Sequence, residues 1–324
     1  AESEDGIMWI GMWGGGLDLF DRETNTYRHF MPHDNVLDNP ERISSYFVRD
    51  LFIDSENYLW ISTFNGLNRL NLNNDAEKWH FERFLYQPDN PNSVSLNRIW
   101  TVYEDSKKCI WIGTYGGGLD YFNRKDNSFV HFKHEENKPN TLNNNFIRCI
   151  YESSDGTLWI GTSGGLNKMS IKNDDVTRAV FTNYTVDNGL PNNVIYGILE
   201  DREGNLWMST NKGISKFNPE KETFKNYDIS YGLQSNEFNG GAYLKASDGK
   251  MYFGGINGIS AFYPENIKNN KKKPTIRITD FQLFNKSVPV GELPGGRTIL
   301  QKDISLTETI ELSYQDYVFT FEFA

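Results

Sequence analysis

Residues 155–169 read DGTLWIGTSGGLNKM, and this short run contains a pattern that recurs along the whole chain. At its centre is Trp159, preceded by the pair Asp155-Gly156 and followed by Gly165-Leu166. Copies of this pattern occur six times, and their central aromatic residues are Trp9, Trp60, Trp111, Trp159, Trp207 and Tyr252. Five of the eight tryptophans in the sequence therefore occupy one repeat position.

The spacing between the copies indicates the architecture. Successive central aromatics are 51, 51, 48, 48 and 45 residues apart. A period of about 48 residues is typical of a four-stranded propeller blade and is longer than a leucine-rich repeat or a helical pair. Hydrophobic residues do not recur with the 3.6-residue period of a helix. The sequence therefore predicts an all-β propeller built from four-stranded blades.

Each copy also predicts where its strands lie. An acidic residue and a glycine before the central aromatic, as in Asp155-Gly156, favour a two-residue turn with positive φ between the first and second strands. The pair Gly-Leu or Gly-Ile, as in Gly165-Leu166, is expected to open the third strand. We expect the fourth strands to end on an aromatic residue, at Phe30, Phe84, Phe132, Tyr184 and Tyr227.

Counting these strands gives the domain organisation. The chain is expected to enter at the second strand of one blade, to pass four complete blades, and to leave after the third strand of a sixth. Because a blade buries its faces only against its neighbours, we interpret residues 1–264 as part of a propeller that has seven blades in the whole protein. Residues 265–274 are polar and basic and are predicted to be a linker.

A second all-β domain is predicted after the linker. Residues 276–281 and 318–323 alternate between apolar and polar side chains, which is typical of strands with one apolar face. The 50 residues from 275 to 324 are fewer than the roughly 100 that a β-sandwich needs. We therefore expect residues 275–324 to be the start of a truncated β-sandwich.

Composition argues against several classes of function. With 43 acidic and 33 basic residues the net charge is −10, which disfavours a protein that tracks phosphates along nucleic acid. The sequence has no apolar run of 18 residues, and its first residues lack the features of a signal peptide. Cys109 and Cys149 have no metal-binding spacing. We predict no metal, no cofactor and no nucleic-acid partner.

The repeats resemble a known family. Residues 155–169 and residues 106–122 (SKKCIWIGTYGGGLDYF) are similar to two-component-regulator propeller repeats. Residues 231–267, followed by PTIRITDFQLFNKSVPVG at 274–291, resemble the passage from the last blade of that family into its β-sandwich, the Y_Y_Y domain. The resemblance implies the sensor region of a bacterial hybrid two-component histidine kinase that controls carbohydrate utilisation.

The resemblance carries further expectations. It implies a periplasmic region of an inner-membrane protein, attached to the membrane only through segments outside this chain. The chain would bind an oligosaccharide signal and relay it through the sandwich, paired in a homodimer, to regulate polysaccharide-utilisation genes. It would not itself be an enzyme.

Two other functions stay open on the sequence alone. A propeller glycoside hydrolase or lyase would need two carboxylates at a defined separation on one face. Most acidic residues here, such as Asp54, Asp105 and Asp201, are instead repeat-phased and are interpreted as solvated turn residues, so no catalytic residue is predicted. A scaffold that binds another protein is the second alternative.

Propeller geometry nevertheless locates a candidate ligand site. Eleven residues before the central aromatics, on the first strands that line the channel, lie Arg49, Trp100, Arg148 and Tyr196. The aromatics would be stacking platforms and the arginines clamps for an anionic or neutral saccharide. Loop tips between second and third strands add Trp13, Phe64 and Tyr115 as rim candidates. The alternative is structural: the arginines would pair with acids of neighbouring blades, and the aromatics would pack there.

Overall fold

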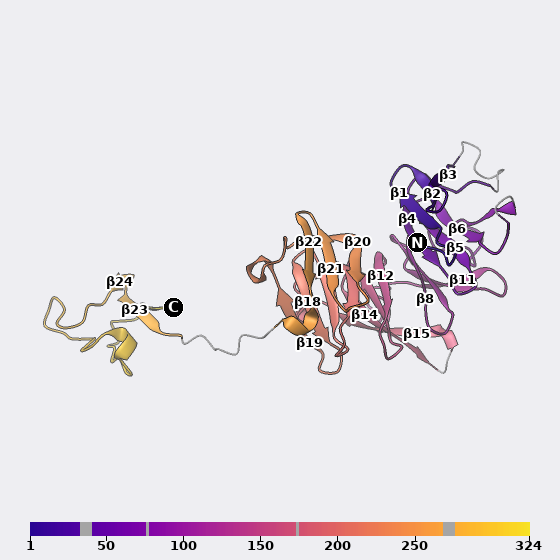
Figure 1. Cartoon of the computed structure of the whole chain (residues 1–324). Helices are drawn as coiled ribbons and strands as arrows, with labels where there is room; N and C mark the ends of the chain where they lie inside the picture. The colour runs from indigo at the N-terminus through magenta and orange to yellow at the C-terminus, as the bar shows by residue number, and fades with distance from the viewer. Residues whose placement is uncertain (33–40, 76–77, 173–174, 268–275) are drawn as a thin grey trace. The chain divides into compact units, whose positions relative to one another are not determined.

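The computed structural model of the protein describes residues 1–32, 41–75, 78–172, 175–267 and 276–324 (Figure 1). The chain forms two compact units, Ala1–Asn266 and Ile267–Ala324. Residues 268–274 of the predicted linker lie outside the described residues.

The first unit consists of antiparallel sheets in which strands that are consecutive in the chain lie side by side. The first two sheets contain β1 (Met8–Met12), β2 (Gly16–Asp21) and β3 (Thr26–Phe30), then β4 (Val48–Ile53), β5 (Tyr58–Thr63), β6 (Gly66–Asn71) and β7 (Phe81–Phe84). The third and fourth contain β8 (Ile99–Glu104), β9 (Ile110–Thr114), β10 (Leu119–Asn123) and β11 (Ser128–Phe132), then β12 (Ile147–Glu152), β13 (Leu158–Thr162), β14 (Leu166–Lys172) and β15 (Asp175–Tyr184). The fifth and sixth contain β16 (Ile195–Glu200), β17 (Leu206–Thr210), β18 (Gly213–Asn218) and β19 (Thr223–Tyr227), then β20 (Phe238–Lys245), β21 (Met251–Gly255) and β22 (Gly258–Phe262).

This arrangement confirms the predicted blades. Three strands form the first sheet, four strands form each of the next four, and three form the sixth. The fourth strands end at the predicted aromatic residues. Within the described ranges the helices are single turns, namely η2 (Val186–Asn188), η3 (Ile229–Tyr231), η4 (Pro264–Asn266) and η5 (Ile304–Leu306).

The repeated tryptophan is the centre of each complete blade. Trp60, Trp111, Trp159 and Trp207 are at most 1% exposed. In three blades the indole Nε1 donates to the aspartate six residues earlier, at 2.7 Å in Trp60–Asp54, 2.8 Å in Trp111–Asp105 and 2.9 Å in Trp207–Asp201. These aspartates are buried, so their interpretation as solvated turn residues is wrong. Each of these carboxylates accepts an indole N–H and so has a structural role. Its position in the repeat does not by itself show whether the aspartate is buried or exposed to solvent.

The turn between the first and second strands also differs from the prediction. Gly156 has the expected positive φ of 81°, and its N–H donates to the carbonyl of Ser153. The N–H of Ser153 in turn donates to the carbonyl of Thr157, so three residues separate the paired ends instead of two. A glycine with positive φ suits both turn lengths, which is why the sequence did not separate them.

The second unit is a small antiparallel sheet with its own core. Its strand order is β24 (Lys286–Ser287), β23 (Ile278–Leu283) and β25 (Phe319–Phe323), which places strands in both of the predicted segments. Apolar side chains packed under the sheet are Phe281, Val288, Ile299, Leu300 and Ile304. Within the described ranges of the chain, no helix is long and apolar enough to span a membrane.

The glycine that opens a third strand generates a stability prediction. Gly118 has φ 91°, and a Cβ at this position would overlap the carbonyl oxygen of Phe132. Gly118→Ala should lower the free energy of unfolding by roughly 2–5 kcal/mol, because left-handed strain and a backbone clash add. The equivalent Gly258, with φ 118°, has open space around its Cβ position, so Gly258→Ala should show only the strain, about 1–2 kcal/mol. Equal losses in denaturant titrations would contradict the proposed clash.

A second feature of the fold is a buried carboxylate beside a histidine. Asp120 Oδ1 lies 2.7 Å from His131 Nδ1, and its Oδ2 accepts from the N–H of Ser95. The other ring nitrogen, Nε2, lies 2.9 Å from the carbonyl oxygen of Pro91. Two acceptors on the two ring nitrogens favour the doubly protonated imidazolium. The hydrogen bond to Asp120 accordingly raises the pKa of His131, while burial raises the pKa of Asp120.

This pair predicts a pH-dependent contribution to stability. Because the pKa of His131 is higher in the folded state, its stabilisation is complete below the unfolded value of about 6.5 and is lost as pH rises through the folded value. His131→Gln should therefore cost more at pH values well below 6.5 than in alkaline solution. Denaturant titrations over a pH series measure this difference, with His80→Gln, at an exposed position, as the control. A cost that is constant with pH would rule out the imidazolium.

Candidate ligand-binding site

The first strands of five consecutive blades meet at the centre of the propeller. Strand β4 contacts β8, and the contacts continue from β8 to β12, from β12 to β16 and from β16 to β20. Arg49 on β4 reaches the last of these strands, where its Nη2 donates to the carbonyl of Gly240 on β20 at 2.9 Å. Side chains from distant parts of the chain therefore share one small region.

The structure brings together the four residues predicted on these strands. The guanidinium carbon of Arg49 lies 4.3 Å from the ring centroid of Trp100, and that of Arg148 lies 5.1 Å from it. Arg148 also lies 5.7 Å from the ring centroid of Tyr196. Two positive charges therefore surround one indole ring. We call Arg49, Trp100, Arg148 and Tyr196 the arginine–tryptophan cluster.

The three predicted rim residues extend this cluster. Tyr115 stacks on Trp100 with ring centroids 5.1 Å apart. Phe64 also stacks on Trp100, with ring centroids 6.3 Å apart. Trp13 meets Phe64 edge-on at 4.9 Å. All seven predicted residues thus belong to one continuous series of contacts. Their role in binding a ligand stays a prediction.

Two further aromatics were missed in the sequence. Phe47 packs edge-on against Trp13 at 5.4 Å, and Phe146 packs in the same way against Tyr115 at 4.7 Å. Both are substantially exposed and lie 13 residues before the tryptophans of their own blades. This shared spacing is the feature of the sequence that could have identified both residues.

Exposure separates the roles of the two tryptophans. Trp13 is 64% exposed, so a large part of its ring is open to a ligand. Trp100 is partly buried, and among the described residues its Nε1 has no acceptor. Because a guanidinium already lies over the ring of Trp100, this residue is better placed to hold arginines than to stack on a sugar. Trp13 is the better stacking platform.

The arginines themselves have neutral partners. Arg148 Nε donates to Ser163 Oγ at 2.9 Å, and Arg49 donates to a backbone carbonyl. In the described part of the chain neither forms an ion pair, so the alternative in which they pair with acids of neighbouring blades is not observed. The nearest acid in sequence, Asp50, accepts from Thr101 Oγ1 instead. Desolvation lowers the pKa of Arg49, as expected for a cation held away from water.

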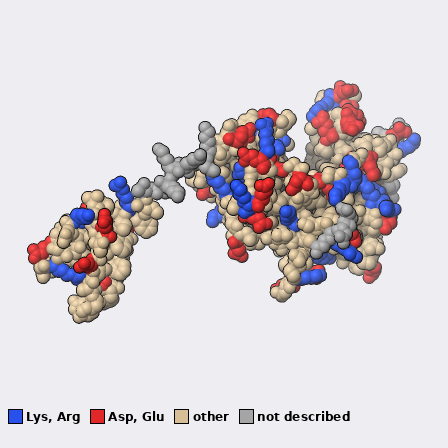
Figure 2. Space-filling view, turned by 90° about the horizontal axis from the view of Figure 1, so that it is seen from below, with Lys and Arg blue, Asp and Glu red and all other residues tan. Residues whose placement is uncertain are grey.

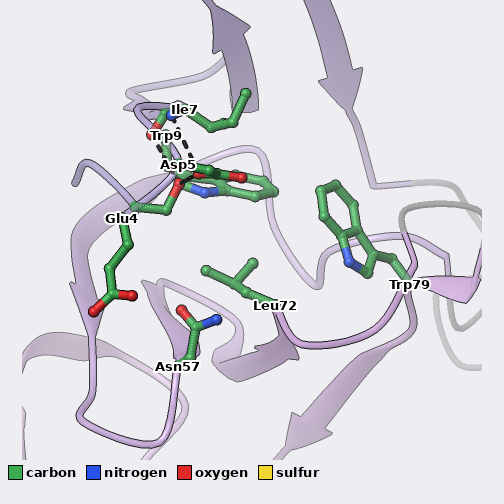
Figure 3. Close-up of a pocket in the computed structure, with 8 residues that line it drawn as sticks. Glu4, Asp5, Ile7, Trp9, Asn57, Leu72 and Trp79 are labelled. Carbon is green, nitrogen blue, oxygen red and sulfur yellow. Dashed lines mark hydrogen bonds between the residues drawn. The ribbon is translucent and has the colours of Figure 1, made fainter.

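A cavity lies in the first two blades (Figure 3). It has a volume of about 220 Å³ and is bordered by Trp9 and Trp79, whose ring centroids are 5.4 Å apart. Trp9 is the repeat tryptophan of the first blade, but among the described residues its Nε1 has no acceptor. At the position six residues earlier is Ser3, whose hydroxyl bonds to Asp5. The two tryptophan rings pack against each other between the first two blades. The residues that line the cavity include no cationic group.

Neither region is a metal site in the part of the chain that the structure describes. No group of three or more His, Cys, Asp or Glu side chains is placed there to hold a metal ion. The chemistry of the arginine–tryptophan cluster is therefore that of aromatic faces and guanidinium donors.

Comparison with known proteins identifies the repeats. The two-component regulator propeller model matches residues 42–65, 93–116, 141–164 and 189–212. Over all 324 residues the chain is 27% identical to "Histidine kinase P4" of Formosa agariphila, of which it covers 19%. It also aligns over its full length with the extracellular domain of the hybrid two-component system BT3049 from B. thetaiotaomicron, with 28% identity and a TM-score of 0.74. The chain covers 40% of that domain, so it spans well under half of either relative.

A more distant likeness concerns the fold alone. A virginiamycin B lyase from Staphylococcus aureus is 16% identical, with 83% of this chain and 84% of the lyase aligned at a TM-score of 0.52. At that identity the two proteins share a propeller architecture, and a propeller hosts many unrelated activities.

Proposed function

We propose that this chain is a sensor region that binds an oligosaccharide signal at its arginine–tryptophan cluster. Its two-component regulator propeller repeats and its homology to the extracellular domains of hybrid two-component histidine kinases support the sensor role. The observation that carries the proposal is the joining of an open aromatic ring to guanidinium donors on one face. Sugars are recognised in this way, because an aromatic ring covers the apolar face of the pyranose while polar groups bind its hydroxyls.

The contacts give each residue a role in this proposal. Trp13, with its exposed ring, is the stacking platform. Phe47 and Phe64 pack against its edges and fix its orientation. Arg49 and Arg148 supply donors on the deeper side, held over Trp100. The ligand would then contact a rigid frame of blades through side chains whose positions are already set.

The parts of the signalling route outside this chain belong to the same proposal. In the whole protein the propeller would lie in the periplasm, and a histidine kinase in the inner membrane would transmit the signal. The second unit would pair in a homodimer and pass ligand binding towards the membrane. The regulated genes would be those for polysaccharide utilisation, which is the setting that the sequence resemblance implies.

The catalytic alternative has less support. Asp54, Asp105 and Asp201, the carboxylates most regularly placed along the chain, accept indole N–H groups in the interior of the blades. They are therefore committed to packing and unavailable as an acid–base pair. The proposed ligand is bound and released unchanged.

Binding to a panel of acidic and neutral oligosaccharides tests this function. Isothermal titration calorimetry should detect a ligand, and chromatography of the same mixtures should detect no product. Trp13→Ala should weaken that binding by roughly 2 kcal/mol, or about thirtyfold, because a stacking aromatic ring is lost.

The matched control is Tyr27→Ala, which removes another exposed aromatic ring from β3, a fourth strand at the outer side of a blade. Its affinity should equal that of the unmodified chain. Unchanged affinity in Trp13→Ala would place the ligand elsewhere, and turnover of any oligosaccharide would refute the sensor mechanism.

A further inference from the structure

We infer that the arginine–tryptophan cluster selects an anionic saccharide, one that carries a carboxylate or sulfate group, over its neutral counterpart. This inference rests on the proposed function and specifies its ligand class. It is carried by the charges of the cluster and by the groups that surround them.

Two cations lie on one ring, and among the described residues neither forms an ion pair. The guanidinium carbons of Arg49 and Arg148 lie 4.3 and 5.1 Å from the ring centroid of Trp100. Desolvation lowers the pKa of Arg49, the charge of Asp50 raises it, and the charge of Arg148 lowers it. The two like charges beside this ring repel, and the indole ring offsets only part of that cost. A bound anion would offset the rest.

Other arginines in the propeller show what is missing here. Arg69 also lies among aromatic rings, but it forms an ion pair with Glu82. Arg124 forms ion pairs with Asp54 and Glu56 of the neighbouring blade and with Glu104 of its own blade. The fold therefore supplies carboxylates to these two partly buried arginines. For Arg49 and Arg148 it supplies only a carbonyl and a hydroxyl among the described residues.

These neutral partners leave several guanidinium donors without a described acceptor. Arg148 uses its Nε on Ser163, and among the described residues nothing accepts from its two Nη atoms. Arg49 uses Nη2 on Gly240, which leaves its other nitrogens without a described acceptor. A guanidinium with two free N–H groups on one edge matches the two oxygens of a carboxylate or sulfate.

The backbone of the sixth blade makes room for this arrangement. A Cβ on Gly241 would lie 3.1 Å from Arg49 Nη1, and one on Gly240 would lie 3.2 Å from Nη2. At this level β20 has a register shift between Phe238 and Tyr243 that bends the strand. Glycine at both positions lets the guanidinium lie against the strand while its charge stays unpaired.

The favoured anion is a small one on a sugar ring, not a polyphosphate chain. Acidic and basic side chains are interspersed on the face shown in Figure 2, with no broad basic track for a nucleic-acid backbone. Among the described residues, the cations beside the ring of Trp100 are Arg49 and Arg148. That combination matches one acidic group on a sugar whose apolar face stacks nearby.

Paired ligands test the inference. Calorimetry would compare a short oligogalacturonide with its carboxyl-reduced form, and a sulfated galactan oligosaccharide with its desulfated form. We expect one acidic member to bind at least about thirtyfold more tightly than its neutral partner, and the pair that shows this separates carboxylate from sulfate recognition. Arg148→Gln should remove most of that preference, and raising NaCl should weaken binding to the unmodified chain.

Arg178→Gln, an exposed arginine on β15, is the matched control and should leave both affinities unchanged. If Arg148→Gln unfolds, as judged by circular dichroism, Arg49→Lys provides the second test, because it keeps the charge but removes the two-pronged donor. Equal binding of acidic and neutral forms, with unchanged affinity in the arginine variants, overturns the inference and leaves the proposed function standing. Failure of every oligosaccharide to bind overturns both.

Discussion

The structure depends on burying one tryptophan ring per blade against the sheet that follows. In the complete blades this ring is almost fully enclosed, and in three of them a buried aspartate accepts its N–H. The packing continues across blades, as in the cluster that joins Trp111 and Leu119 to Ile147 and Ile160 of the next sheet. Polar contacts reinforce it, since Glu104 accepts from both the backbone and the hydroxyl of Ser55 in the preceding blade. These contacts fix the position of each blade relative to its neighbour.

That fixed arrangement brings together the residues of the proposed ligand site. Each first strand enters the centre at the same level, so residues at one repeat position meet although they are far apart in sequence. Arg49 and Arg148 are 99 residues apart and approach the same indole ring. In the core of each complete blade, one repeat position carries the same residue, tryptophan. On the first strands at the centre, another repeat position carries different residues. Under the proposed function, variation at this level would alter recognition without disturbing the tryptophan contacts.

The sequence was sufficient for features that follow from the repeat period. The strands, the positive φ of Gly156, and the meeting of Trp100, Arg148 and Tyr196 all follow from spacing. Features that depend on side-chain direction did not follow. The burial of Asp105 depends on whether its carboxylate faces the indole or the solvent, and both directions share one sequence position. The two guanidiniums beside Trp100 have the same origin, because spacing places the ring at the centre but does not say which groups cover it.

Under the proposed function, the arginine–tryptophan cluster would also link ligand binding to the association of blades. Arg49 belongs to the second sheet and bonds to Gly240 of the sixth, while Trp100 belongs to the third. Arg148 belongs to the fourth and lies beside Tyr196 of the fifth. The proposed anion, bound to both guanidiniums, would reduce the repulsion between strands of different sheets, so its binding free energy would include a contribution from how those sheets pack. The proposed signal would require no catalytic step, because the energy of the ligand contacts would itself change the balance of forces between blades.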